Sequence, residues 1–429
     1  MKDLRPRFSL LFADPDKPTQ SVYSEETLAF LEPLPVGEED HAVLLKILSL
    51  RTSRKDIAFR KEITEDFLRS PALFDKYEDI CRKWEGLYET AKRERDLPPD
   101  ADYEQALEAL KVNTVSLMEH LSFLRRSADE TARLTPDSGG LFALSEFLRQ
   151  HGESESVKKL TQEIGNYPLL KSEKAKAVLQ IHTDAVGAAA AADLRYLGND
   201  DGKFLKKHPP RREDFSADLP KDRALELTTQ AIFRLSDTFR ALTNQIRTAF
   251  LPLKEGLVFY RFALSICEWA GTKGFEWLFP SPLATQSPAG KSIRDLREMM
   301  GPALSPVTLT SRPLEAYAGE WGTEILKIIA RTQIFAAAGL PIVAADAVFC
   351  PDQTVVVYDS KGKTMEQEVA ALAEIFHHTK KNDMILLNHP LITVGNAPAR
   401  EITEHLLSTF LKKGACVRIA ANWPTEELL

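Results

Sequence analysis

The chain has 429 residues, enough for about three folding units with cores of their own. Its 55 Lys and Arg residues and 62 Asp and Glu residues give a net charge of −7. This balance excludes a polycation that coats nucleic acid or anionic lipid through charge alone. With 44% hydrophobic and 27% charged residues, the composition excludes collagen-like, mucin-like and low-complexity classes. Any contact with DNA must therefore use a local basic patch.

The four cysteines, Cys81, Cys267, Cys350 and Cys416, lie far apart in the sequence and form no CxxC spacing. We expect buried thiols in a reducing compartment. The longest uncharged apolar run, residues 334–345, is shorter than the roughly 20 residues that span a bilayer, and the apolar stretch near the N-terminus is too short for a signal-peptide core. We expect a cytoplasmic protein with no membrane partner.

Helical periodicity dominates residues 1–176. Apolar residues recur every three to five positions over 103–134, which indicates one apolar helix face. Ser53 followed by Asp56 is typical of a capping box that opens a helix, and Ser70-Pro71 closes that helix. We predict a helical core or lever domain, first part, over 1–176.

The pattern changes over residues 177–221. Short β-capable pieces and an alanine run precede a turn-rich, basic and proline-containing segment, which we interpret as a small insertion. A second helical part follows over 222–289. Its apolar stripe from Ile232 to Phe250 steps by three and four residues and indicates core packing, until Pro252 interrupts the helix.

From residue 290 the sequence alternates between strand-like and helix-like segments. The runs 307–311, 354–359, 383–388 and 416–421 are short and apolar or β-branched. The continuous apolar run at 384–387 is typical of a strand buried on both faces of a parallel sheet. We predict a mainly helical lever or core domain, followed over 290–429 by a doubly wound α/β domain with a mostly parallel sheet.

General catalytic motifs give no answer, because GxSxG, HExxH, GxGxxG and the calcium-binding EF-hand loop are all absent from the sequence. The order of several weaker segments is more informative. These segments are 48–84, 324–345, 365–376, 385–389, 410–415 and 419–423. In this order they resemble the MutS family, the dimeric ATPases of DNA mismatch repair and DNA-structure sensing. The resemblance runs from about residue 40 to the end, although no single motif is intact, and it lacks the mismatch-reading domain.

The resemblance implies a P-loop ATPase-type domain over 290–429 and a clamp-like, DNA-contacting insertion. It also allows a comparison of the nucleotide site. A P-loop needs glycines to cradle phosphates, a Lys for the β and γ oxygens and a Ser or Thr for Mg²⁺. In the corresponding stretch, 316–323, Gly319 and Thr323 remain, and Gly322 stands at the lysine position. Glu320 and Trp321 oppose an anion by charge and by bulk.

The other nucleotide motifs have also lost the charged residues that the family uses. Asn388 replaces the Walker B Asp, His389 replaces the adjacent Glu that would activate water, and Asn422 replaces a switch His. The resemblance therefore implies a degenerate nucleotide site made of Gly319, Gly322, Thr323, Asn388, His389 and Asn422, with no catalytic residue and no metal ligand. We predict a pseudo-ATPase that holds ATP or ADP, if it holds either, without hydrolysis and without Mg²⁺. The alternative is a diverged but active ATPase that uses Asn388 and His389.

Five cations lie within ten residues of the insertion, namely Lys203, Lys206, Lys207, Arg211 and Arg212. They are candidate contacts to a DNA backbone. The alternative is a solvated loop, because Glu213, Asp214 and Asp218 follow closely. We expect a MutS-like protein that binds DNA structures, or acts as the inactive subunit of a homodimer or of a heterodimer with another MutS-like subunit. A regulatory scaffold that touches no DNA is the competing hypothesis.

Overall fold

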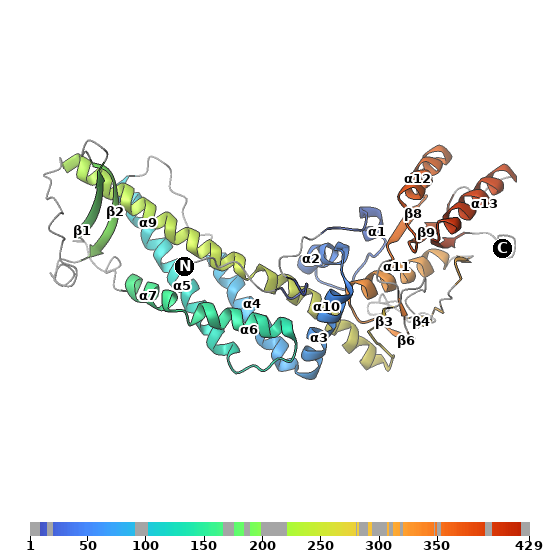
Figure 1. The fold of residues 1–429 in the computed structure, drawn as a ribbon, viewed down its shortest axis with the longest axis horizontal. Coiled ribbons are helices and arrows are strands. Elements are labelled where there is room, and N and C mark those ends of the chain that lie inside the picture. The colour runs from blue at the N-terminus through green and yellow to red at the C-terminus, as the bar shows by residue number, and fades with distance from the viewer. Residues whose placement is uncertain are drawn as a thin grey trace. The chain divides into compact units, whose positions relative to one another are not determined.

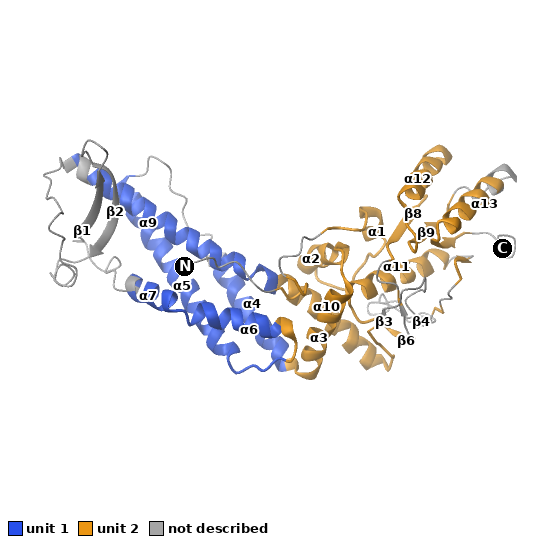
Figure 2. Cartoon of the chain, in the orientation of Figure 1, with its two compact units in different colours: residues 1–8, 72–136, 141–253 blue, residues 9–71, 137–140, 254–429 orange. Residues whose placement is uncertain are grey.

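The chain divides into two compact units (Figure 2). Unit 1 comprises residues 1–8, 72–136 and 141–253, and unit 2 comprises residues 9–71, 137–140 and 254–429. The computed structural model describes residues 9–14, 20–90, 102–165, 176–183, 189–198, 221–279, 281–282, 291–293, 307–308, 312–317, 321–346, 348–349, 353–390 and 397–421. Across these ranges, every helix is too short or too polar to cross a membrane.

Unit 1 is helical apart from one hairpin. Its helices are α4 (Pro71–Thr90), α5 (Tyr103–Thr131), α6 (Gly139–Gly152), α7 (Glu155–Gly165) and α9 (Lys221–Ala249). The two longest, α5 and α9, lie side by side (Figure 1). Asn113 on α5 donates from Nδ2 to Ser236 Oγ on α9 at 2.8 Å, and the rings of Phe123 and Phe250 are 5.0 Å apart. Further along α5, the contacts are made with residues further along the α9 segment, so the two helices run parallel.

The apolar stripe predicted over residues 232–250 forms this packing. Ile232, Phe239, Ile246 and Phe250 are all buried, which confirms the interpretation as core. A helix of this length needs such an apolar face, since most helical stability in proteins comes from packing.

An antiparallel hairpin of β1 (Lys176–Thr183) and β2 (Ala189–Gly198) lies within the insertion predicted from the sequence. The hairpin contacts α9 (Figure 1). The alanine run of the sequence thus forms part of a strand, although alanine favours helices, because pairing between strands overrides local propensity.

Unit 2 contains seven helices among the described residues. They are α1 (Glu25–Ala29), α2 (Glu38–Ser49), α3 (Arg54–Arg69), α10 (Leu251–Lys273), α11 (Gly322–Ala338), α12 (Met365–His378) and α13 (Ala397–Lys412). Side chains cap the first turns of α1, α3 and α12. Ser53 and Asp56 form the predicted capping box of α3, and Thr364 with Gln367 caps α12 in the same way. Helix α11 ends at Gly339, whose φ of +80° suits a residue without a Cβ.

Two buried arginines attach the N-terminal segment of unit 2 to helix α11. Arg60 donates from Nε to the carbonyl of Leu11 and from Nη1 to that of Ala338, both at 2.7 Å. Arg331 of α11 donates to the carbonyl of Leu31 at 2.8 Å. Burial lowers the pKa of Arg60 to about 10, and these carbonyls replace the hydration that the guanidinium loses.

The sheet of unit 2 has four parallel strands in the order β5 (Leu314–Tyr317), β10 (Cys416–Ala420), β9 (Met384–Asn388) and β8 (Val355–Asp359). All residues of β9 and β10 are buried, as predicted for 384–387. Two-stranded pairings join β3 (Ser281–Pro282) to β7 (Val348–Phe349) and β4 (Lys291–Ile293) to β6 (Ala344–Asp346).

Helices α11, α12 and α13, which connect the strands, pack against the sheet. Leu372 of α12 and Phe410 of α13 form one core with Ile385 and Val417 of the sheet. Helix α11 also contacts β8, β9 and β10. The structure therefore confirms a mainly helical part and an α/β part with a parallel sheet.

Three of the four predicted strands belong to the parallel sheet. Strands β8, β9 and β10 confirm three of the four runs, whereas most of 307–311 lies outside the described residues. The sequence reasoning missed β5, because Leu314–Tyr317 contains a glutamate and shows no long apolar run. Cys81, Cys267 and Cys416 are buried thiols, as expected, and Cys350 lies outside the described residues.

Candidate functional site

The candidate site lies at the carboxyl ends of the strands in unit 2. Strand β5 is followed, after residues 318–320, by helix α11, while β9 and β10 end beside it at Asn388 and Ala420. Strand β10 lies between β5 and β9 although it comes last in the sequence, so the chain crosses from β5 to β8 at the far edge of the sheet and then turns back towards β5. In open α/β sheets, ligands bind outside the carboxyl ends of the strands at such a change in direction.

Three side chains named from the sequence meet at this edge. Thr323, the second residue of α11, donates from Oγ1 to Asn388 Oδ1 at 2.8 Å. The same hydroxyl lies 3.0 Å from His389 Nε2. Asn388 is buried, and Thr323 and His389 are half-buried. We call this set the Thr323 trio, in which the Thr323 hydroxyl is the shared hydrogen-bond partner of Asn388 Oδ1 and His389 Nε2.

The backbone of His389 is held in an unusual conformation. Its φ is +45°, in the left-handed region that residues with a side chain rarely occupy. The His389 amide donates to the carbonyl of Ala420 at 2.8 Å, and Ser360 Oγ donates to the His389 carbonyl. These two bonds hold the imidazole beside Thr323, at a conformational cost that is commonly found at binding sites.

Gly322 packs too tightly to carry a side chain. A Cβ at this position would lie 2.8 Å from the Tyr317 carbonyl oxygen and 3.1 Å from the Ala420 Cβ. Tyr317 O also accepts a hydrogen bond from the amide of Ala421, so it cannot easily move. The position that the resemblance equates with the P-loop lysine thus has no room for a lysine in this backbone.

The charged side chains of β5 and β10 near the site pair with each other within the sheet. Arg418 of β10 is fully buried, and its Nε lies 3.0 Å from Glu315 Oε2 on β5. Tyr317 Oη also donates to this carboxylate at 2.7 Å. Burial and the neighbouring Glu315 raise the pKa of Tyr317, so it remains a neutral donor. The Glu315 charge is therefore neutralised within the sheet.

One residue that the sequence reasoning did not select stands at the same edge. Asp359 ends β8 and pairs in register with Asn388. Its Oδ1 accepts a hydrogen bond from the amide of Lys361 at 3.0 Å. Only the strand order reveals this proximity, because 29 residues separate Asp359 from Asn388 in the sequence.

The remaining predicted residues lie outside the described part of the chain. These are Gly319, Asn422, Lys203, Lys206, Lys207, Arg211 and Arg212. Glu320 lies outside it as well, whereas Trp321 is 60% exposed at the N-cap of α11.

The chemistry of the Thr323 trio is that of neutral donors and acceptors. A hydroxyl and an amide oxygen are possible Mg²⁺ ligands, but without a carboxylate they hold a divalent cation weakly. Within the residues described by the structure, no cluster of three or more His, Cys, Asp or Glu side chains is placed to hold a metal ion. A scan against models of known protein families and a search of curated proteins both found no match to this chain.

Proposed function

We propose that the chain is a MutS-like protein whose nucleotide-binding domain does not hydrolyse ATP and which acts by binding DNA structures. The observation that carries this proposal is the Thr323 trio. The sequence resemblance equates Thr323 with the Mg²⁺-binding P-loop residue, and Asn388 and His389 with the Walker B pair. These residues are 65 and 66 positions apart, yet their side chains are within hydrogen-bonding distance at 2.8 and 3.0 Å.

The topology supports the same proposal. Strand β5 and a short segment precede the helix that carries Thr323, and the buried strand β9 ends at Asn388, as a P-loop domain requires. Strand β10 keeps β5 and β9 apart, and Thr323 at the start of α11 reaches Asn388 at the end of β9. A chance match of short motifs would not place these residues in contact.

The absence of hydrolysis follows from the charges at the site. Phosphoryl transfer depends almost wholly on positioning and on electrostatic stabilisation. Gly322 supplies no cation, and Asn388 and His389 supply no carboxylate. Losses of single groups of this kind typically reduce rates by orders of magnitude.

DNA binding is the part of the proposal that rests on sequence alone. The five cations at 203–212 follow hairpin β1–β2 within the insertion and precede helix α9. A basic segment of this kind in an acidic chain can neutralise backbone phosphates and release counterions.

Steady-state turnover of Mg-ATP by the purified chain tests the first part. We expect no turnover above the buffer rate. Turnover that disappears in an Asp359→Asn variant would contradict the proposal and favour an active ATPase, because Asp359 is the carboxylate that the strand register brings beside Asn388.

Gel shifts with duplex, mismatched and branched DNA at several salt concentrations test the second part. Replacing Lys206, Lys207, Arg211 and Arg212 by Gln should weaken binding and reduce the slope of log K against log salt by about 0.9 for each lost phosphate contact. A control with Arg54, Lys55, Lys361 and Lys381 replaced, all exposed, should keep the slope. Absence of salt-sensitive binding to any of these DNAs would favour the scaffold hypothesis.

A further inference from the structure

A pocket of about 510 Å³ opens at the other edge of the same sheet, toward the amino ends of β8 and β9. We call it the amino-edge pocket. Its walls come from residues 20–26, residues 48–52, the last turns of α11, the start of β8, and the end of α12 with the turn that follows. All of these segments belong to unit 2. The volume lies in the range typical of sites for small organic molecules.

The feature that points to a ligand is the side chain of Gln353. This residue lines the pocket, is 2% exposed, and has no hydrogen-bond partner for either Oε1 or Nε2. A buried amide without partners costs free energy, so native proteins rarely retain one. Neither atom is accessible to solvent in this structure, so the amide meets a ligand in the pocket only once the Gln353 side chain turns toward it. Its adjacent donor and acceptor then match a ligand edge that carries the complementary pair, as an adenine edge does when glutamine recognises it.

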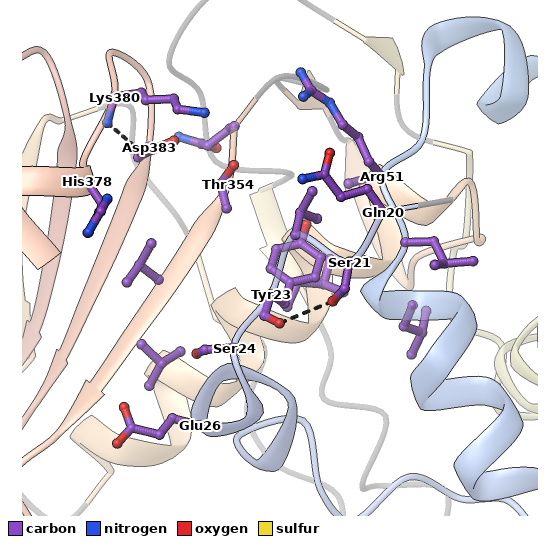
Figure 3. A pocket seen from close by; sticks show the side chains of 18 of the residues that line it. Gln20, Ser21, Tyr23, Ser24, Glu26, Arg51, Thr354, His378, Lys380 and Asp383 are labelled. Atoms are coloured by element: carbon purple, nitrogen blue, oxygen red, sulfur yellow. Dashed lines mark hydrogen bonds between the residues drawn. The ribbon is translucent and has the colours of Figure 1, made fainter. Parts of the chain in front are cut away.

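Two cations stand at the rim of the pocket. Figure 3 shows Arg51 and Gln20 on one side, and Lys380, Asp383 and His378 on the other. Arg51 and Lys380 are exposed, and in the described part of the chain neither side chain has an ion-pair partner. They are therefore available to an anionic group, which guanidinium and ammonium groups bind through charge-assisted hydrogen bonds.

The acidic residues of the lining do not cancel these cations. Asp383 Oδ2 accepts the Lys380 amide at 2.7 Å, and burial raises the pKa of this carboxyl. Glu26 pairs with Lys363 at 3.2 Å. Glu374 is exposed on α12. Within the described part of the chain, Glu374 is therefore the lining carboxylate that most opposes an anion.

The rest of the lining suits a flat ring. Val22, Leu48, Ile334 and Val356 provide apolar surface, and Tyr23 provides an aromatic ring (Figure 3). Ser24 and Thr354 provide hydroxyls of the kind that fix the orientation of a sugar. The lining thus combines an amide, an apolar surface, hydroxyls and two cations.

We propose that the amino-edge pocket binds a nucleoside monophosphate, with its base edge against Gln353 and its phosphate between Arg51 and Lys380. This site is separate from the Thr323 trio, which lies at the opposite ends of the same strands. The proposal does not depend on the proposed function, because none of its residues belongs to the trio.

Calorimetric titration of the full chain with AMP, GMP, CMP and UMP tests the proposal, with inorganic phosphate and the four nucleosides as comparison probes. At least one monophosphate should bind, and more tightly than its nucleoside and than phosphate. Gln353→Met and Arg51→Ala should each weaken that binding by about ten- to a hundredfold, the usual effect of losing a hydrogen bond to a buried or charged group.

Matched variants separate this site from the other edge. Lys381→Ala changes an exposed lysine beside Lys380 that does not line the pocket, and it should leave binding unchanged. Arg51 is exposed, so its variant should fold normally, which thermal unfolding checks.

Three results would overturn the proposal. They are no binding of any monophosphate at millimolar concentration, phosphate binding as tightly as the monophosphates, and binding that Gln353→Met and Arg51→Ala leave unaltered. Loss of binding in Thr323→Val alone would place the nucleotide at the carboxyl edge, which overturns this inference and supports the nucleotide-binding part of the proposed function.

Discussion

The two edges of the parallel sheet differ in whether their buried polar side chains have hydrogen-bond partners. At the carboxyl edge, Thr323 is within hydrogen-bonding distance of Asn388 and His389, and the close packing at Gly322 leaves no room for a side chain. At the amino edge, both polar atoms of Gln353 are buried without partners. A set of side chains that satisfies itself contributes to stability, whereas an unsatisfied buried amide lowers stability unless a ligand completes it. The comparison therefore predicts opposite effects of mutation at the two edges.

The largest effect is expected at Gly322. Gly322→Ala introduces a Cβ that lies 2.8 Å from a backbone oxygen, so the start of α11 or the end of β5 must shift. We expect a loss of about 2–3 kcal/mol in the free energy of unfolding, as for overpacked cores. Urea denaturation measures it. Gly86→Ala, where a Cβ would meet nothing within 4 Å, is the control and should not destabilise the chain. Equal stability of the two variants would contradict the tight packing.

Thr323→Val should destabilise the chain by about 2 kcal/mol, because it leaves the buried Asn388 oxygen without its donor. Thr332→Val is the matched control on the same helix, since that hydroxyl donates only to the Ile328 carbonyl one turn away. A double-mutant cycle with Asn388→Leu should give a coupling energy of about 1 kcal/mol. Strict additivity would show that the trio contributes no mutual stabilisation.

Gln353→Met should change stability in the other direction. The substitution keeps the length of the side chain and removes two unsatisfied polar atoms, so without ligand we expect a gain of up to about 1 kcal/mol. Asn113→Leu provides the contrast, because that equally buried amide donates to Ser236 and its loss should destabilise. A clear loss of stability in Gln353→Met would remove the distinction between the two edges.

The smallest effect is expected at Asp383. Burial raises the pKa of this carboxyl above its ordinary value of 3.8, so the folded chain holds the proton more tightly than the unfolded chain. Stability from this group is present at low pH and is lost as the pH rises through the folded pKa. Asp383→Asn should therefore be more stable than the wild type at neutral pH, and the difference should shrink towards pH 3.8. Thermal unfolding over roughly pH 4–8 measures it, and an advantage that grows on acidification would contradict the assignment.

The sequence was most informative where a local rule decides the structure. The capping box at Ser53 and Asp56 and the stripe from Ile232 to Phe250 were found as predicted. These patterns are reliable because caps and helix faces depend on residues three or four positions apart. Strand β5 was missed because Glu315 breaks its apolar pattern, and only its ion pair with Arg418 makes that residue suitable for a sheet.

The candidate site shows the same division. The sequence named Thr323, Asn388 and His389, because an ordered resemblance keeps the positions of motifs even when the residues change. It did not indicate Asp359 beside Asn388, or the excluded volume at Gly322, since both depend on strand register and on close packing. The amino-edge pocket has no sequence signal at all, because Arg51, Gln353 and Lys380 come from separate segments.

The sequence by itself determined the helical character of the N-terminal part, the position of the β-capable insertion, and three of the four strands of the sheet, and it named Thr323, Asn388 and His389 as candidate site residues. Only the tertiary structure decided the strand order and the helices that share a unit with the sheet. It also decided which polar atoms have partners. The physical reason is that propensity and periodicity act over a few residues, whereas register, exclusion of a side chain and hydrogen-bond satisfaction depend on segments hundreds of residues apart.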